Sequence, residues 1–191
     1  NFRVDFVNHL INEGYEVIIL TSRDEYATKI KNLLDAKCIF IPMRTLSKNF
    51  FFEFITLLYY FYYFIKIRPQ FFLGFTHKSN IYGSIISIIL GIPYINNIAG
   101  LGSVFKDKTI TTYILMLLYK FICRFSYQVI FQNEDDMKLF IENKLVNNNI
   151  ELVPGSGVNI NKFFYSPIDI SQREFNITFL FFSRLIREKG I

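Results

Sequence analysis

The sequence predicts an α/β fold with a mostly parallel sheet that carries helices on both faces. Segments with helical spacing of apolar residues alternate with short apolar runs, and glycine or proline stands at several of the junctions. A chain of 191 residues is long enough for a domain with a real core. Sheets of this kind bind ligands beyond the carboxyl ends of their strands, so the loops that follow the strands are the informative segments.

The first half of the chain repeats a unit of helix, break and strand. Apolar spacing predicts a helix that ends at Gly14, a strand that Pro42 stops, and a long helix that ends before Pro69. Gly91 and Pro93 close the fourth helix, and the same alternation continues beyond it. The predicted helices cover residues 2–12, 24–36, 49–67, 79–90, 111–126 and 134–143. The predicted strands cover residues 15–20, 37–41, 70–75, 94–98, 128–132 and 151–154.

The pattern divides the chain into one large domain and the start of another. Residues 1–165 form the first domain, and both ends of the chain look cut, so we expect its first strand to precede residue 1. Residues 166–175 are polar, contain Pro167 and indicate a linker. Residues 176–182 read as a new buried strand, so residues 176–191 are predicted to begin a second domain.

Composition narrows the classes of partner. The net charge is +5 and aromatic residues make up 18% of the chain, which excludes a disordered protein and suits phosphorylated substrates or an anionic membrane surface. No Lys/Arg run is dense enough to indicate nucleic-acid binding. Cys38 and Cys123 lie far apart in apolar runs, which favours two free thiols in a reducing cytoplasm. No spacing typical of metal ligands is present, so no metal is expected.

The segment after the predicted strand 70–75 concentrates polar groups at the expected ligand edge. Thr76, His77, Lys78 and Asn80 place donors, acceptors and a cation within five positions. The N-terminus of the helix that follows adds free N–H groups, which favour anions. On spacing alone, capping of that helix by Ser79 or Asn80 is the favoured explanation.

Two glycine-containing loops follow later strands. Gly100 and Gly102 lie after the strand 94–98, where they allow a backbone to approach a ligand or to adopt positive φ; on the spacing alone, a simple turn is the favoured explanation. Gly155 and Gly157 lie after the strand 151–154, in a loop that suits a phosphate or a hinge. Neither loop has the full spacing of a dinucleotide or phosphate-binding motif.

Charged residues mark two further loops. Arg184, Arg187 and Lys189 follow the predicted strand 176–182, and a guanidinium with an ammonium suits a diphosphate. A solvated basic loop is the alternative. Asn133 precedes three acidic residues at 134–136, and helix capping is favoured there over acid–base chemistry.

Taken in order, four segments resemble the family-4 glycosyltransferases of the GT-B fold, in particular bacterial members that build glycans on a polyprenyl-diphosphate carrier. The resemblance runs nearly end to end. The matching stretches are residues 76–105, 129–140, 152–163 and 179–191. Asn159 departs from the family, which usually has Asp after the Gly-Ser-Gly-Val sequence.

The resemblance implies two Rossmann-like domains that face a cleft, with the acceptor on the first and the nucleotide-sugar donor mainly on the second. Arg184 and Lys189 match the family's R-x4-K-G pattern, which implies that they hold the donor diphosphate. His77 is implied as a catalytic residue. The remaining matches are to the acceptor and cleft loops: Thr76, Lys78, Asn80, Gly100, Gly102, Gly155 and Gly157.

The implied reaction is transfer of a hexose or N-acetylhexosamine, with retention of anomeric configuration, to a polyprenyl-diphosphate-linked acceptor. The nucleotide sugar is a substrate, so no cofactor is expected. Two other classes stay open: a non-catalytic doubly wound module that binds phospholigands, and an integral membrane protein with spans near residues 50–65 and 110–123. We expect instead a peripheral protein on the cytoplasmic membrane face, where Lys48, Lys66 and Arg68 flank an aromatic helix.

Overall fold

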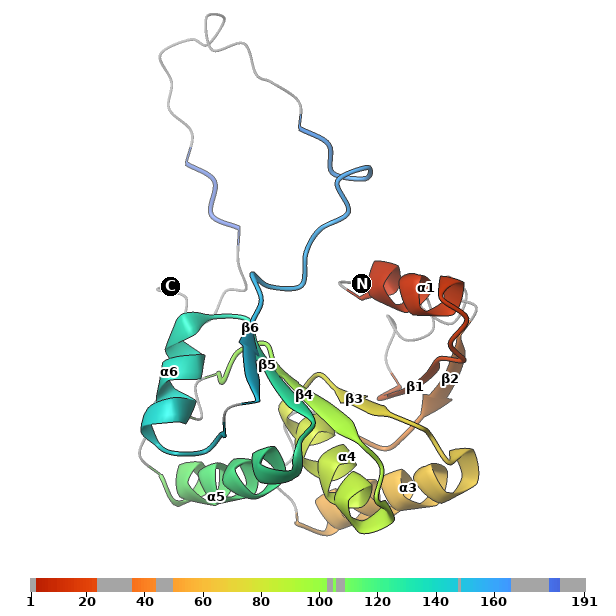
Figure 1. Ribbon diagram of the computed structural model, residues 1–191, viewed down its shortest axis with the longest axis vertical. Coiled ribbons are helices and arrows are strands. Elements are labelled where there is room, and N and C mark those ends of the chain that lie inside the picture. Colours follow the sequence, from red (N-terminus) through yellow and green to blue (C-terminus); the bar gives the residue numbers. More distant parts are fainter. Residues whose placement is uncertain are drawn as a thin grey trace, which may run out of the picture. The chain divides into compact units, whose positions relative to one another are not determined.

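The computed structural model describes residues 3–23, 36–43, 50–102, 105, 109–147, 149–165 and 179–182. They fall into two compact units, Asn1–Gly157 and Val158–Ile191. The first unit contains every helix and strand assigned in the described residues (Figure 1).

The order of elements confirms the predicted alternation wherever the structure describes it. The helices are α1 (Val4–Asn12), α3 (Phe50–Ile67), α4 (His77–Leu90), α5 (Ile110–Phe125) and α6 (Glu134–Glu142). The strands are β1 (Ile18–Thr21), β2 (Lys37–Phe40), β3 (Phe72–Gly74), β4 (Tyr94–Ile98), β5 (Gln128–Phe131) and β6 (Ile150–Leu152). The predicted helix 24–36 lies outside the described residues except for its last position.

All strand pairs are parallel, as predicted, but the described strands form two sheets instead of one. Strands β1 and β2 pair with each other, and a second sheet has the order β3-β4-β5-β6. In the second sheet each strand pairs with the next one in the chain, and α4, α5 and α6 make the crossovers that parallel pairing needs. The carboxyl ends of these four strands therefore lie along one edge.

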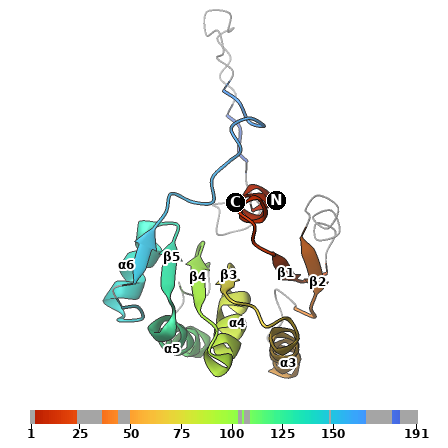
Figure 2. The same cartoon turned by 45° about the vertical axis from the view of Figure 1, so that its right-hand side comes forward.

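Helices α3, α4 and α5 lie side by side as a row along one side of the strands, in both views (Figures 1 and 2). Helix α4 occupies the middle of the row and contacts α3, α5, β3 and β4. Helix α1 lies across the strands from this row in both views, and its Phe6 meets Phe75 edge to face, directly after β3. The prediction of helices on both faces is confirmed.

The close approach of α4 to β3 depends on two glycines. A Cβ at Gly83 would lie 2.1 Å from the ring of Phe72, and a Cβ at Gly74 would lie 2.3 Å from the Asn80 side chain. The Phe72 ring packs in turn against Tyr60 and Phe64 of α3. The buried apolar residues form two clusters. One lies between the four-stranded sheet, α4, α5 and α6, and the other joins α3 to α4 through Tyr60, Phe64 and Ile86.

The part of the second unit around residues 179–182 differs from the prediction. Residues 179–182 were expected within a buried strand, but they form no strand and their side chains are 58–96% exposed. A strand needs a neighbour for its backbone N–H and C=O groups, and no described residue of this unit provides one.

Asn159 closes a turn by accepting hydrogen bonds from the N–H groups of Asn161 and Lys162, as its side chain allows.

Candidate functional site

The polar loops singled out in the sequence gather at the carboxyl edge of the four-stranded sheet. The loops after β3, β4, β5 and β6 begin at Phe75, Ala99, Gln132 and Val153 respectively. Side chains from the first turns of α4 and α6 reach into the same region, as the hydrogen bonds below show.

The N-terminus of α4 is capped by Thr76, whose side chain accepts from the N–H of Ser79. Capping is therefore confirmed, but the expected cap residues, Ser79 and Asn80, were wrong, because the helix begins two residues earlier, at His77. The side chain of Thr76 is exposed at this edge. Thr76 thus combines a structural role with access to solvent.

Lys78 and Asn80 are each held by another part of the protein. The Lys78 ammonium forms an ion pair of 2.5 Å with Glu53 of α3, whose other carboxylate oxygen accepts from the Tyr82 hydroxyl. The Asn80 side chain is 1% exposed, and its amide donates to the carbonyl of Asn97 in β4 over 3.1 Å. These contacts tie α4 to its neighbours, and the acceptor-side role of both residues stays a prediction.

His77 lies half-buried between two aromatic rings. Its Nδ1 is 2.7 Å from the hydroxyl of Tyr119, and its ring stacks on Phe105 at 5.9 Å between centroids. Burial lowers the pKa of His77 from 6.5, while hydrogen bonding to the backbone of Leu101 and Gly100 and the charge of Asp136 act in the opposite direction. Burial also raises the pKa of the Tyr119 hydroxyl, which therefore keeps its proton.

This environment gives His77 a structural role. A neutral imidazole has one donor and one acceptor nitrogen. Tyr119 occupies Nδ1, and the backbone of Gly100 and Leu101 meets the ring as well. The catalytic role implied by the resemblance stays a prediction, since the geometry by itself accounts for His77 as a link between α5 and the Gly100–Gly102 loop.

The Gly100–Gly102 loop is fixed by backbone and side-chain contacts. Gly102 has φ 67°, in the left-handed region that favours glycine, which confirms the reading of this loop as one that needs positive φ. Between the glycines, the Leu101 side chain is 4% exposed and belongs to the main apolar cluster. The N–H of Leu101 donates to Oδ2 of Asp136, at the first turn of α6, over 3.1 Å.

The loop after β6 is tied to β5 and β4 by one glutamine. Nε2 of Gln132 donates to Oδ1 of Asn97 over 3.2 Å and to Oγ of Ser156 over 3.1 Å. Ser156 stands between Gly155 and Gly157, which have φ of 87° and 73°. The boundary between the two units follows Gly157, so this loop leads directly into the second unit.

One contributor to this edge, Tyr119, was not singled out from the sequence, whereas Gln132 and Asp136 lie in the segment 129–140 noted there. Tyr119 could have been found, because it lies on the same helical stripe as Thr112 and Cys123, both buried. The acids at 134–136, which include Asp136, were interpreted mainly as suiting the start of a helix, with acid–base chemistry as the less favoured alternative. Arg184 and Lys189, the predicted diphosphate-binding residues, lie outside the described residues, so their role stays a prediction.

No group of three or more His, Cys, Asp or Glu side chains that could hold a metal ion occurs in the part of the chain that the structure describes.

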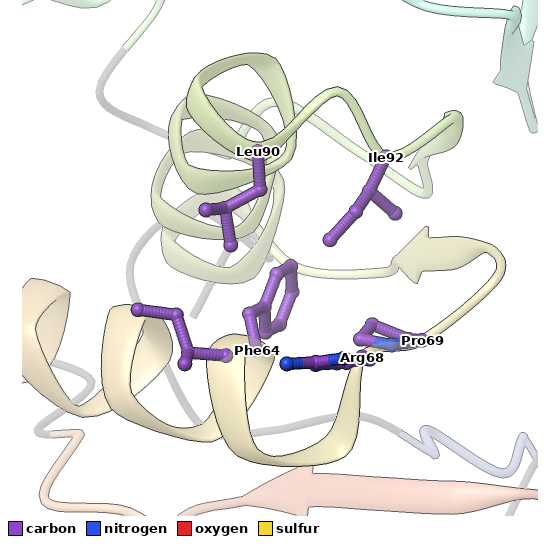
Figure 3. Close-up of a pocket in the computed structure, with 6 residues that line it drawn as sticks. Phe64, Arg68, Pro69, Leu90 and Ile92 are labelled. Atoms are coloured by element: carbon purple, nitrogen blue, oxygen red, sulfur yellow. The ribbon is translucent and has the colours of Figure 1, made fainter.

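A separate apolar pocket of about 240 Å³ is lined by Phe64, Ile65, Arg68, Pro69, Leu90 and Ile92 (Figure 3). It opens where α3 and α4 end and where β3 and β4 begin. It is therefore at the amino ends of the strands, away from the loops described above.

Comparison with known proteins gives consistent matches. The family described as "Glycosyl transferase 4-like" matches residues 2–133. A curated relative from Campylobacter jejuni, N,N'-diacetylbacillosaminyl-diphospho-undecaprenol alpha-1,3-N-acetylgalactosaminyltransferase, is 28% identical over 183 residues. That alignment covers 91% of this chain and 47% of the relative, so the chain spans about half of the relative's length.

Two solved structures show the same fold at low sequence identity. Anabaena Alr3699/HepE in complex with UDP and glucose superposes with a TM-score of 0.60 at 16% identity, over 88% of this chain and 45% of its own. MurG from Acinetobacter baumannii superposes with a TM-score of 0.55 at 13% identity, over 90% of this chain and 43% of its own. The fold is therefore α/β of the GT-B type, as the sequence predicted.

Proposed function

Because the chain belongs to the glycosyl transferase 4-like family, we propose that the full-length protein transfers a sugar from a nucleotide-sugar donor to a lipid-linked saccharide. The observation that carries this proposal is the similarity, over 91% of the chain, to a transferase whose name specifies an undecaprenol-diphosphate-linked acceptor. HepE, which shares the fold, is described with UDP and with UDP-glucose. Synthesis of a bacterial polysaccharide or glycan is the corresponding process.

The proposed reaction displaces a nucleoside diphosphate by a hydroxyl of the acceptor, with retention of anomeric configuration. Negative charge grows on the departing diphosphate, so fixed cations beside it lower the barrier. Arg184 and Lys189 are the proposed cations, Arg as a planar fork and Lys as a point charge. The proposal requires no metal and no cofactor. His77 is retained as its proposed catalytic residue, with Thr76, Lys78, Asn80 and the four loop glycines at the acceptor side.

Sugar transfer by the purified full-length protein tests this function. Labelled nucleotide sugars are offered with a polyprenyl-diphosphate-linked saccharide, and the anomeric configuration of the product is read by NMR. We expect Arg184→Ala and Lys189→Ala each to lower kcat/KM for the donor about 10- to 150-fold, which corresponds to about 1.5–3 kcal/mol for a charge-assisted hydrogen bond.

Arg187→Ala is the matched control, because it removes a cation from the same loop but lies outside the R-x4-K-G pattern. If all three variants lose activity equally, the loop acts only through its net charge. If the full-length protein binds nucleotide sugars but transfers none to any acceptor, the chain is part of a phospholigand-binding module instead.

We also propose that the protein attaches to the cytoplasmic face of the membrane through the outer faces of α3 and α5. Helix α3 is the one described helix with the length and hydropathy of a membrane span, but Thr56, Tyr60 and Phe64 on its inner face are buried in the protein. This packing favours a helix that lies on a bilayer over one that crosses it. The exposed apolar residues of α3 are Phe50, Phe51, Phe52, Phe54, Leu58, Tyr59, Phe61, Tyr62 and Ile65.

Helix α5 adds a second apolar face in the same row of helices. Its exposed apolar residues are Ile110, Tyr113, Ile114, Leu117, Phe121 and Phe125. Exposed cations accompany both helices, namely Lys66 and Arg68 at the end of α3 and Lys120 and Arg124 near the end of α5. Aromatic side chains with nearby cations suit the interface of an anionic bilayer, where each cation contributes about 1 kcal/mol. Lys48, also predicted to contribute, lies outside the described residues.

Flotation of the full-length protein with liposomes tests the attachment. We expect binding to vesicles with anionic lipid at low salt and loss of binding in a variant that neutralises Lys66, Arg68, Lys120 and Arg124. Lys144→Gln, at an exposed position beyond α6, is the control and should float like the parent. If the parent stays in the soluble fraction and elutes as an oligomer, the apolar faces are covered by another subunit.

A further inference from the structure

The Gly100–Gly102 loop is held from two sides by residues of different helices. Asp136, at the start of α6, accepts the N–H of Leu101. His77, at the start of α4, meets the backbone of Gly100 and Leu101. Both contacts go to backbone groups between or beside the glycines, so they fix the path of the loop and not one particular side chain.

The Asp136 carboxylate is not needed to cap its own helix. Asn133 does that, since its Oδ1 accepts the N–H of Asp136 over 2.8 Å. The amide of Asn133 also donates to Oδ2 of Asp136 over 2.7 Å, which orients the carboxylate. The same oxygen receives the Leu101 N–H over 3.1 Å. Helix capping therefore accounts for Asn133 and leaves the contact of Asp136 with the loop as a separate feature.

His77 is equally restrained on the other side of the loop. Tyr119 binds its Nδ1, Phe105 stacks on its ring, and Tyr119 itself is fully buried in α5. The Leu101 side chain is buried in the main apolar cluster, which also contains Phe105 and Tyr119. The loop is thus anchored at three points: a backbone N–H, a backbone contact with an imidazole, and a buried leucine.

We propose that Asp136 is a positioning residue for the transfer reaction: through the Leu101 N–H, and together with His77, it holds the Gly100–Gly102 loop in its ligand-ready conformation. This inference rests on the proposed function, which places the loop in the cleft. A loop that is already ordered does not have to be ordered by the substrate, so binding and orientation are both favoured. Asp136 acts on the backbone of the loop and does not touch the substrate.

Substitutions at Asp136 in the full-length protein separate this role from a general effect of charge. We expect Asp136→Ala to lower kcat/KM about tenfold or more, the usual consequence of losing a hydrogen bond to a charged group. Asp136→Asn keeps an oxygen that accepts the Leu101 N–H and should stay within about threefold of the parent. Asp135→Ala is the matched control, because it removes an exposed carboxylate from the same first turn of α6.

Hydrogen exchange supplies a readout that does not depend on activity. In Asp136→Ala, we expect the amide protection of a peptide that covers residues 99–102 to fall, while protection of α6 and of β5 stays as in the parent. Asp135→Ala should leave the loop protected. If Asp136→Ala does not fold, Asp136→Glu replaces it, because it keeps the charge but displaces the carboxylate by one methylene, and the same loss of loop protection is expected.

The two readouts distinguish failure of the inference from failure of the proposed function. Unchanged loop protection in Asp136→Ala, or equal losses of activity in Asp136→Ala and Asp135→Ala, would overturn the positioning role. If the parent transfers no sugar to any acceptor, the proposed function fails, and the exchange data still decide whether Asp136 holds the loop.

Discussion

Two neighbouring helices, α3 and α4, distribute their polar and apolar residues in opposite ways. Helix α4 buries Asn80, Ser84 and Ser87 along one stripe, where Asn80 and Ser84 bind Asn97 and Asn96 of β4. Helix α3 buries only Thr56, Tyr60 and Phe64 and leaves nine large apolar side chains exposed. The two helices pack against each other, so the difference arises between direct neighbours and not between distant parts of the protein.

The difference follows from position in the row of helices. Helix α4 lies between α3 and α5 and against β3 and β4, so protein covers it on both flanks and on the side of the sheet (Figure 2). Among the helices described here, α3 makes its extensive contact with α4. Two of the buried polar residues of α4, Asn80 and Ser84, find hydrogen-bond partners in β4, whereas Oγ of Ser87 has no partner among the described residues. The apolar side chains on the outer face of α3 are not covered by other described residues. This exposed apolar face motivates the proposal that the protein attaches to a membrane.

The contrast is sharpest within α3 itself, at Tyr60 and Phe54. Tyr60 is 0% exposed and packs on Phe64 and Phe72, whereas Phe54 is 49% exposed. We expect Tyr60→Ala to lower the free energy of unfolding by about 3–5 kcal/mol, as for other large core aromatics, and Phe54→Ala to cost below about 1 kcal/mol. Denaturant unfolding of the full-length protein measures both. Similar costs would show that the outer face of α3 is also covered in solution.

A second test concerns the polar connection between the two helices. Glu53 of α3 accepts from both Lys78 and Tyr82 of α4, and the Glu53 and Lys78 side chains are 20% and 21% exposed. Glu53→Ala removes the shared acceptor, so we expect a loss of about 1.5–3 kcal/mol in stability, and Tyr82→Phe a loss of about 1 kcal/mol. The loss for Glu53→Ala should shrink in high salt, because partly exposed charges are screened. A loss that is independent of salt would point to packing instead.

A third test probes the tight side of α4. Gly83→Ala places a methyl group against the Phe72 ring, which Tyr60 and Phe64 hold from the other side. We expect overpacking to cost about 1–3 kcal/mol, despite the higher helix propensity of alanine. Thermal melts of the full-length protein measure the effect. A stabilised Gly83→Ala variant would mean that β3 and α4 separate more easily than their packing indicates.

Part of this arrangement could be predicted from the sequence. Alternating periodicity located every described strand and helix, and an Asn followed by three acids identified the cap of α6, because these signals are local. The start of α4 was misplaced by two residues, since Thr76, Ser79 and Asn80 all have capping side chains and only backbone geometry decides among them.

The remaining features depend on contacts distant in sequence. The bond from Leu101 to Asp136 spans 35 residues and that between His77 and Tyr119 spans 42, so no local pattern encodes either one. The burial of Asn80 depends equally on Asn97, a strand away. The predicted strand at residues 176–182 failed at residues 179–182 for the same reason, because apolar composition alone does not supply a neighbouring strand.

The smallest expected effect lies at the first residue of α4, where the buried and exposed surroundings of the helix meet. Burial lowers the pKa of His77 below 6.5, so between its folded-state value and 6.5 the unfolded state binds more protons than the native state. Stability therefore rises with pH across this window and is lost as pH falls below about 6.5. His77→Gln should remove this part of the pH dependence, so the Tm of the variant should change less between pH 5.5 and pH 7.5 than that of the parent. Melting curves of the full-length protein at pH 5.5 and 7.5 measure it, with His9→Gln, at an exposed position of α1, as the control for loss of an imidazole. If both variants keep the pH dependence of the parent, burial does not affect the protonation of His77. The difference between the buried face of α4 and the exposed face of α3 then does not extend to the carboxyl edge of the sheet.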